Sequence, residues 1–323
     1  MSAPTVTVVV PTHARPAQIE ACLDGLSRLD PVPGGFEIVI VDDGSPRSIE
    51  TLIAAWQDRL PIRLIVRARG GPAKARNSGA EMARGRYLAF IDDDCVPLPG
   101  WLSALVRELE RRPNFLLGGP VSNGLPDNPY ATATQSITTY AQQYYRSKGG
   151  NEPFFTTNNL AVSKERFRHV DGFNTSIRSG TGEDREFCDR WLSYNYPMAN
   201  VPDAEVIHSH PLTLRRFLRQ HFNYGRGILA VRLIRRRREP SRFVPEPVSF
   251  YWNLILFPLR DRERNHVWRD VALMIAAQLA TIVGFFSAAL IDLPGQRAAL
   301  RSDDPGAVKR SVLLDQSDKA RRD

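Results

Sequence analysis

The clearest chemistry in this sequence lies in an apolar run that stops at three consecutive carboxylates. Residues 87–91 are apolar enough to form a strand buried on both faces of a parallel sheet, and Asp92, Asp93 and Asp94 follow directly. Ligands of open α/β sheets bind just beyond the carboxyl ends of such strands. Hard cations such as Mg²⁺ or Mn²⁺ take oxygen ligands, and a substrate phosphate often completes the shell. The stretch predicts a metal-diphosphate site, with a solvated acidic turn as the alternative.

A second acidic strand end and a basic helix start accompany this cluster. Asp42 and Asp43 follow the apolar run 36–41, and a helix predicted from Pro72 carries Lys74 and Arg76 in its first turns. A carboxylate can accept a hydrogen bond from a nucleobase N–H, and an arginine fork can meet a base or a diphosphate. For the aspartates, the alternative is a helix N-cap or an Asx turn, which Asp-Asp-Gly-Ser sequences often form.

The elements that position these residues alternate in type along the chain. Strands are predicted at 6–10, 36–41, 62–66 and 87–91, with helical patterns between them. This order predicts an α/β fold with a doubly wound, mostly parallel sheet. A dinucleotide-binding Rossmann domain would place Gly-x-Gly-x-x-Gly after the first strand, where this chain has Pro11-Thr12-His13-Ala14-Arg15, and it has no P-loop sequence.

The basic character of the chain belongs to one segment. The 323 residues carry a net charge of +8, yet residues 211–243 hold ten arginines and one acid, Glu239, which is +9 locally and leaves about −1 elsewhere. Cys22, Cys95 and Cys188 show no zinc spacing and read as free thiols in a reducing compartment. The start of the chain has no basic leader followed by a long apolar run, so the catalytic part is expected to face the cytosol.

Taken in order over residues 6–227, several short motifs resemble those of the family 2 glycosyltransferases with the GT-A fold. They are Val9-Val10-Pro11-Thr12, Val41-Asp42-Asp43-Gly44-Ser45, Ala75-Arg76-Asn77-Ser78-Gly79, Phe90-Ile91-Asp92-Asp93-Asp94, Thr157-Asn158-Asn159-Leu160-Ala161, Gly172-Phe173, Gly182-Glu183-Asp184 and Val206-Ile207-His208. Most of these motifs are weak alone, but so many matches in the family's order are very improbable by chance.

The resemblance implies a nucleotide-diphosphate sugar as donor, expected to be UDP-linked, and Mn²⁺ or Mg²⁺ as cofactor. It assigns the nucleotide and donor sugar to Pro11, Thr12, Asp42, Asp43, Lys74, Arg76, Asp92, Asp93, Gly119 and Asn159. It assigns the metal to Asp94, Asp92 and His208, and a loop histidine is the alternative for His208.

The resemblance also implies which carboxylate does the chemistry. Asp184 matches the family's base, with Glu183 as the weaker candidate. Sugar transfer with inversion needs one carboxylate to remove the acceptor hydroxyl's proton, while the metal stabilises the departing diphosphate. The alternative is an acidic pair that favours the N-terminal dipole of a helix over residues 185–194. Asn174 stands where the family usually has Asp, so no acceptor contact is assigned there.

The segment after the base resembles members of the family that add a single sugar. Processive synthases carry Gln-x-x-Arg-Trp, and this chain has an Arg-Gln and Tyr-Gly-Arg-Gly pattern instead. The resemblance puts Arg219, Gln220, Tyr224 and Arg226 on the acceptor or diphosphate side. Residues 214–222 place apolar and basic side chains on different helical faces, which predicts a cationic amphipathic helix. We expect an anionic membrane surface as its partner, more than a solvated face, and nucleic acid least.

Two apolar runs follow, at residues 248–259 and 271–291. The second has no charge and nearly the length of a membrane span, and basic residues flank it on both sides. It is expected to dip into one leaflet, alone or with the first run, or to be a buried dimerisation helix. Charge and low aromatic content predict a disordered tail. The predicted segments are a GT-A domain at 1–210 (nucleotide half about 1–95, acceptor and catalytic half about 96–210), an Arg-rich amphipathic segment at 211–244, a hydrophobic helical region at 245–301 and the tail at 302–323.

Together these features predict an inverting, metal-dependent glycosyltransferase at the cytoplasmic face of a membrane, peripheral or monotopic. It would add one sugar to a lipid-linked or cell-envelope glycan acceptor. Two alternatives stay open. One is a nucleotidyltransferase acting on sugar phosphates, which shares an α/β nucleotide domain and an acidic metal site. The other is a catalytically inactive membrane- or nucleic-acid-binding protein, against which Asp92, Asp94 and Asp184 argue.

Overall fold

A seven-stranded sheet, order β3-β2-β1-β4-β8-β6-β9, lies at the centre of the fold. The computed structural model describes residues 3–147, 154–177, 181–238, 246–260 and 266–292. Strand β8 runs antiparallel to both of its neighbours, and the other pairs are parallel. The strands are β1 (Val6–Thr12), β2 (Phe36–Asp42), β3 (Ile62–Val66), β4 (Tyr87–Phe90), β6 (Leu116–Gly118), β8 (Leu160–Ser163) and β9 (Met198–Asn200). The expected mostly parallel sheet is confirmed.

Helices cover both faces of this sheet because successive strand residues point to opposite sides. Val8 and Val10 pack with α1, α2 and α4 on one face, whereas Val9 and Phe90 pack with α3, α6 and α7 on the other. Full burial of such a side chain contributes about 1.5–3 kcal/mol. These helices are α1 (Pro16–Leu26), α2 (Glu50–Ala54), α3 (Pro72–Met82), α4 (Trp101–Arg111), α6 (Lys164–His169) and α7 (Glu183–Ser193). The four strands nearest the N-terminus occur where the apolar runs predicted them.

A second, three-stranded sheet stands at the end of β4. Its strands are β5 (Cys95–Pro97), β10 (Val206–His208) and β7 (Val121–Asn123), in the order β5-β10-β7. Strand β10 pairs with β5 so that His208 lies opposite Cys95, and the Ser209 N–H donates to the Asp94 carbonyl at 2.8 Å. This register brings His208, the last residue of β10, beside the acidic cluster.

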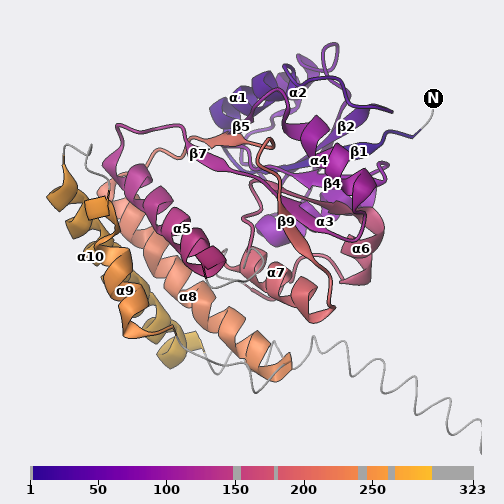
Figure 1. The fold of residues 1–323 in the computed structure, drawn as a ribbon. Helices are drawn as coiled ribbons and strands as arrows, with labels where there is room; N and C mark the ends of the chain where they lie inside the picture. Colours follow the sequence, from indigo (N-terminus) through magenta and orange to yellow (C-terminus); the bar gives the residue numbers. More distant parts are fainter. Residues whose placement is uncertain (1–2, 148–153, 178–180, 239–245, 261–265, 293–323) are drawn as a thin grey trace, which may run out of the picture.

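Four helices form a separate layer beside the sheets. They are α5 (Pro129–Ser147), α8 (Leu214–Arg238), α9 (Val248–Ile255) and α10 (Val267–Ser287), with the short turns η2 (Phe257–Arg260) and η3 (Ala288–Asp292). In Figure 1, α5 and α8 lie between the sheets and the outer helices α9 and α10. The helix expected at 271–291 thus begins four residues earlier and ends in the η3 turn. The tail expected at 302–323 lies outside the described residues.

Two glycines let α8 and α10 touch backbone to backbone. A Cβ on Gly225 would stand 2.0 Å from the Thr281 carbonyl oxygen, and one on Gly284 would stand 1.9 Å from that of Phe222. Neither oxygen belongs to a side chain that could turn away, so any larger residue must push the helices apart. Outer helix α10 is therefore held along α8.

We expect Gly284→Leu to loosen this helix pair. Overpacking a tight contact costs about 1–3 kcal/mol, so the variant should unfold at a lower temperature and be cleaved faster by protease within α10. Ala272→Leu adds the same kind of side chain on the exposed face of α10 and is the matched control. Equal unfolding temperatures for both variants would contradict the close crossing.

Candidate active site

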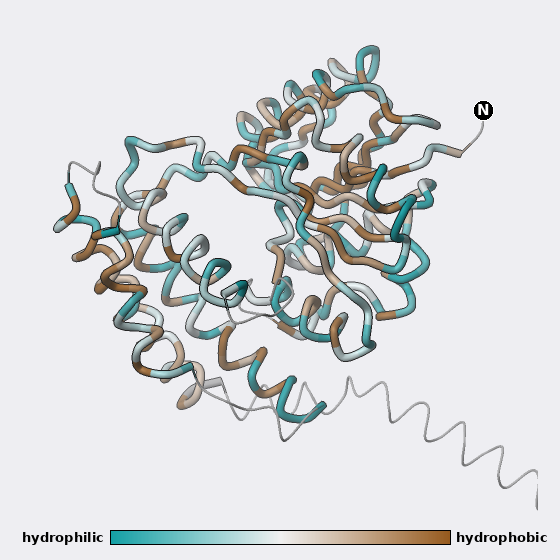
Figure 2. The backbone as a smooth tube through the Cα atoms, in the orientation of Figure 1, coloured by the Kyte–Doolittle hydropathy of each residue, from teal (hydrophilic) through white to brown (hydrophobic). Residues whose placement is uncertain are grey.

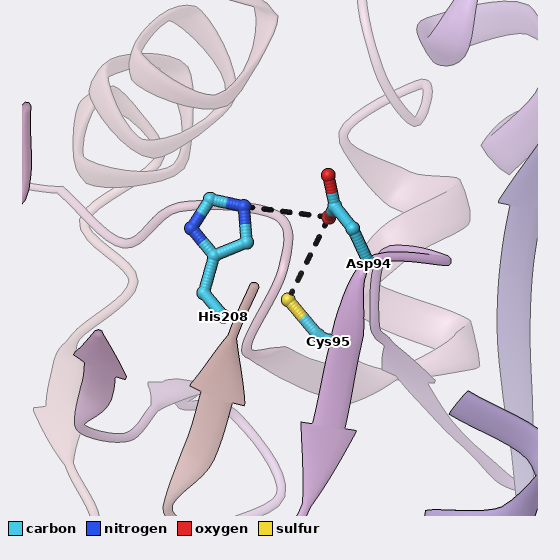
Figure 3. Close-up of side chains that lie close together, drawn as sticks. All are labelled: Asp94, Cys95 and His208. Carbon is cyan, nitrogen blue, oxygen red and sulfur yellow. Dashed lines mark hydrogen bonds and ion pairs between the residues drawn. The ribbon is translucent and has the colours of Figure 1, made fainter. Parts of the chain in front are cut away.

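The three carboxylates that follow β4 have separate partners. Asp94 is 7% exposed, and its two oxygens face two imidazoles: His208 Nε2 lies 3.3 Å from Oδ1 and His210 Nδ1 lies 3.0 Å from Oδ2. Figure 3 shows Asp94 and His208 pointing toward each other, with the Cys95 thiol below them. Ligand atoms of Asp94, Cys95 and His208 all lie within 4.8 Å of one another. These three residues offer one carboxylate oxygen, one thiol and one ring nitrogen to a cation, and His210 adds a second ring nitrogen on the other oxygen of Asp94.

Asp93 and Asp94 also share an arginine. One guanidinium nitrogen of Arg15 donates to Asp93 Oδ1 and to Asp94 Oδ2, each at 3.0 Å. The Thr12 hydroxyl donates to the other Asp93 oxygen at 2.7 Å. Because Thr12 ends β1 and Arg15 precedes α1, the first strand and the acidic strand are joined at the carboxyl edge of the sheet.

Burial and neighbours set the protonation of this cluster. Burial raises the pKa of Asp93 to about 6, although Arg15 acts in the opposite direction. Burial works the same way on Asp94, but hydrogen bonds from His208 and His210 and the charge of Arg15 outweigh it and hold the pKa of that carboxyl below its usual range. Burial and a neighbouring carboxylate raise the pKa of the Cys95 thiol, which keeps it protonated and a poor metal ligand.

The predicted nucleoside residues lie at the ends of β1 and β2, where their polar atoms have internal partners. Asp42 accepts from the Ser45 N–H at 2.9 Å, which is the Asx turn weighed as its alternative. Asp43 accepts from the Gly70 and Gly71 N–H groups and from Arg67, tying two loops together. Pro11 and Thr12 are buried, and Lys74 is exposed in the first turn of α3. Contact of these residues with a nucleoside stays a prediction.

Arg76 joins the acidic strand end after β4 to the first turn of α7. The guanidinium is 3% exposed and donates to Asp92 Oδ1 at 2.5 Å and to Glu183 Oε1 at 3.1 Å. Glu183 is itself 6% exposed, so this pairing occupies its carboxylate within the protein. The contact spans 107 residues of sequence. Arg76 therefore fixes the turn that carries the candidate base relative to the acidic strand.

Asp184 occupies the first turn of α7, beside Glu183. Gly182 precedes the helix at φ +99°, a left-handed conformation that glycine adopts without strain. Among the described residues, the hydrogen bond to Asp184 comes from the Arg185 N–H at 2.7 Å. Burial first, and Glu183 second, raise the pKa of Asp184 to about 6. A half-buried carboxylate with that pKa is poised to accept a proton near neutral pH.

Asn159 and Gly119 lie inside the protein. Asn159 is 1% exposed; its amide donates to the carbonyls of Pro120 and Ala204, and its oxygen accepts from the Trp101 indole. A Cβ on Gly119 would stand 1.8 Å from the Ala204 carbonyl oxygen. These contacts give both residues a structural role, and their expected contact with the donor sugar stays a prediction.

Helix α8 forms the wall of the site next to α7. A Thr181 hydroxyl donates to the Asn223 carbonyl at 2.9 Å, and Gln220 donates to the Tyr224 hydroxyl at 2.6 Å. Arg219 is exposed, whereas Arg226 is half-buried. Beside the imidazoles lies a small cavity of mixed polar and apolar lining, formed by Asn123, Ala131, Thr134, Gln135, His208, His210, Leu212 and Gln220. The oxygen of Gln220 is buried and has no hydrogen-bond partner among the described residues.

Two residues of the site were not predicted. Arg15 stands in the segment where the sequence shows no glycine-rich loop, and His210 follows the predicted ligand His208 by two residues. His210 could have been predicted from its spacing, because residues two apart on an extended segment point the same way and His208 was already an expected ligand. Nothing local marks Arg15, since its partners are 78 and 79 residues away.

Several known proteins with similar sequences or folds are glycosyltransferases. The family model of Glycosyl transferase family 2 matches residues 7–171. The glycosyltransferase AglE of Haloferax volcanii is 27% identical over 72% of this chain and 76% of its own length. The validoxylamine A glucosyltransferase of Streptomyces hygroscopicus subsp. limoneus is 26% identical over 60% of this chain but about half (49%) of its own length.

Among solved structures, the mannosyltransferase PcManGT of Pyrobaculum calidifontis, determined with GDP-Man and Mn²⁺, is similar with a TM-score of 0.57 at 20% identity. That similarity covers 95% of this chain and 81% of PcManGT, and it shows the GT-A fold. The family match spans 165 of the 323 residues and includes the strand ends that carry the acidic cluster. The chain belongs to glycosyl transferase family 2.

Proposed function

We propose that this protein moves one sugar from a nucleotide-diphosphate sugar to a hydroxyl acceptor, with inversion and with Asp184 as base. The observation that carries this proposal is the pair of neighbouring carboxylates at the start of α7. Arg76 binds Glu183, whereas Asp184 keeps a raised pKa of about 6 and no ion pair among the described residues. Glu183 therefore holds the turn in place, and Asp184 is the group suited to take a proton.

The residues around Asp94 fit a divalent cation. Asp94, His208 and His210 would hold it, whereas Asp92 pairs with Arg76. Imidazole nitrogens suit transition metals, whereas Mg²⁺ prefers oxygen ligands, so the donor set favours Mn²⁺ over Mg²⁺. A cation bound there would stabilise the negative charge of the departing diphosphate.

The protein's own residues then carry the remaining steps. Asp184 accepts the proton of the acceptor hydroxyl as that oxygen bonds to the anomeric carbon and the bond from that carbon to the diphosphate oxygen breaks. Arg76 keeps the Glu183 turn aligned with Asp92, so base and donor hold their relative position. Attack on the face opposite the leaving group inverts the anomeric carbon.

Donor class can be identified by binding before any acceptor is known. A ligand that binds only the folded state raises its unfolding temperature. We expect UDP, GDP or their sugar conjugates to stabilise the protein in Mn²⁺ but not in chelator, while nucleoside triphosphates with sugar phosphates give no product. Stabilisation by sugar phosphate plus triphosphate, with release of pyrophosphate, would instead identify a nucleotidyltransferase.

Polar side chains beside the imidazoles suit an acceptor hydroxyl. Asn123, Thr134, Gln135 and Gln220 line a small cavity there together with apolar Ala131 and Leu212, and their uncharged hydrogen-bonding groups match hydroxyls better than phosphates. Gln220 donates a hydrogen bond to the Tyr224 hydroxyl. Burial, and to a lesser extent the charge of Asp184, raise the pKa of that hydroxyl. We therefore place the acceptor hydroxyl between α8 and Asp184. Absence of a Gln-x-x-Arg-Trp sequence favours addition of a single sugar.

The outer face of α10 supports a membrane-linked acceptor. One helix among the described residues, Val267–Leu290, has the length and apolar composition of a membrane span. Its exposed side chains are nearly all apolar and recur at helical spacing: Trp268, Ala272, Ile275, Leu279, Ile282, Val283, Phe286 and Leu290. Trp252 on α9 is exposed as well, and Figure 2 shows hydrophobic turns along the outer helices. Tryptophan and arginine near such a surface favour a lipid interface.

The contact between α8 and α10 decides how this surface meets a bilayer. Since α10 is held along arginine-rich α8 at Gly225 and Gly284, a crossing of the membrane by α10 would draw those arginines into hydrocarbon. We therefore propose that α10 lies in one leaflet and that the protein is monotopic. Buried free thiols at Cys22, Cys95 and Cys188 agree with a cytoplasmic face.

We expect Leu279→Glu to release the protein from vesicles. A carboxylate on the lipid-facing side opposes insertion and repels anionic headgroups, so flotation with phosphatidylglycerol-containing vesicles at high salt should fall from most of the protein to little of it. Met82→Glu, at an exposed methionine of α3, is the control and should float like the unaltered chain. Should the unaltered chain stay out of vesicles and form a dimer that Leu279→Glu dissolves, α10 would be an interface between two copies.

A further inference from the structure

Arg15 stands out as a cation placed on the two acids that a metal ion would also neutralise. One of its two terminal nitrogens, Nη1, lies 3.0 Å from both Asp93 Oδ1 and Asp94 Oδ2. These carboxylates are buried, whereas 41% of the Arg15 side chain is exposed. The arginine therefore reaches the acids from the open side of the site, along which a ligand would enter.

The same carboxylate oxygen serves two partners. Asp94 Oδ2 lies 3.0 Å from Arg15 and 3.0 Å from His210 Nδ1. A divalent cation held by Asp94 and His210 would stand beside the guanidinium, and the two positive charges would repel each other across a few ångströms. Asp93 keeps the Thr12 hydroxyl as a partner in either case. The contact of Arg15 with Asp94 is thus the one that cation binding opposes.

We propose that Arg15 competes with the divalent cation for Asp94 and serves as a ligand of the donor diphosphate when the cation takes that carboxylate. A guanidinium matches phosphate oxygens with two parallel hydrogen bonds, and the long side chain can turn from one anion to another without moving the backbone. Arg15 lies at the end of β1, on the carboxyl edge where ligands of such sheets bind.

This inference rests on the proposed function and makes binding cooperative. Cation binding alone works against the Arg15 contact, whereas a diphosphate that accepts Arg15 removes that opposition. Nucleoside diphosphate should therefore strengthen cation binding, and by reciprocity the cation should strengthen nucleotide binding by the same factor. Arg15 would therefore favour the complex that holds both cation and donor diphosphate over the complex that holds the cation alone.

Neutral and charge-conserving substitutions in the full chain separate the two roles. Arg15→Gln should bind Mn²⁺ alone about three- to tenfold more tightly, because the competing charge is gone. With saturating Mn²⁺, the same variant should bind UDP and GDP about tenfold or more weakly, since a charged hydrogen bond is lost. Arg15→Lys keeps the charge but not the fork and should fall between. Free Mn²⁺ is read by electron paramagnetic resonance and nucleotide binding by calorimetry.

Arg28→Gln removes the same charge from an exposed arginine paired with Asp24 and should change neither affinity. Weaker or unchanged Mn²⁺ binding by Arg15→Gln would overturn the competition, and unchanged nucleotide binding would overturn the diphosphate role. If the unaltered chain with Mn²⁺ binds neither UDP nor GDP, the proposed function fails by itself, while the Mn²⁺ titration still decides whether Arg15 competes.

Discussion

Asp184→Asn should lower turnover about 10²-fold or more while the donor still binds. Asparagine keeps the shape of the side chain and can still accept the hydrogen bond from the Arg185 N–H, but it cannot take a proton. Initial rates of nucleoside diphosphate release, measured beside calorimetric donor affinity, separate the two effects. Turnover close to that of the unaltered enzyme would place the base elsewhere.

Glu183→Gln is the matched control for this substitution. Its amide oxygen can still accept from Arg76, so the turn should persist with a smaller loss of activity than Asp184→Asn causes. Loss of the charge next to Arg76 should show mainly as reduced stability, because Arg76 is buried. A larger loss of turnover in Glu183→Gln than in Asp184→Asn would reverse the assignment of base and anchor.

The raised pKa of Asp184 gives a second readout of the same role. A base must be ionised to accept a proton, so with a pKa of about 6 the rate should rise from pH 5 to pH 7 and then level off in saturating Mn²⁺. That rise should be missing from the residual activity of Asp184→Asn. An unaltered carboxylate pKa near 4 would put the rise about two pH units lower.

Asp94→Ala should abolish the dependence of nucleotide binding on metal. The substitution removes both oxygens that face His208 and His210, so no carboxylate remains between the two imidazoles. Calorimetry with UDP or GDP should show weak binding that is the same with Mn²⁺ and with chelator. The fold should persist, although the loss of a buried carboxylate bonded to Arg15, His208 and His210 should lower the unfolding temperature.

Asp203→Ala provides the control, because this aspartate is 74% exposed and pairs with Arg107 far along the chain from the acidic cluster. It should bind nucleotide like the unaltered protein. Metal-dependent binding that survives in Asp94→Ala would move the metal ligands away from this carboxylate.

The parts of the fold that follow local patterns could be predicted from sequence. Strands β2 and β4 were predicted from apolar runs that end at acidic residues. A buried parallel strand is continuously apolar, so it can be recognised without knowing which strands pair with it. Asp94 and His208 were both predicted as ligands, and the register of β10 on β5 places them together. The sequence motifs therefore identified both residues, but their separation follows from the pairing of β10 with β5.

Contacts between distant segments could not be read from spacing. Arg76 was assigned to the nucleotide side, and its pairing with Glu183 appears only when α3 and α7 pack on one face of the sheet. Arg15 was missed for the same reason. The length of α10 was close to prediction, but its attachment to α8 depends on two glycines that carry no periodic signal.

Release of nucleoside diphosphate from a panel of nucleotide sugars is the most direct test of metal-dependent sugar transfer through Asp184. The purified chain would be incubated with UDP- and GDP-sugars and a membrane lipid extract as acceptor. We predict that at least one donor is cleaved in Mn²⁺, that its sugar appears on the acceptor with inverted configuration, and that chelator or Asp184→Asn removes this activity. Transfer that persists undiminished in chelator and in Asp184→Asn would contradict the account.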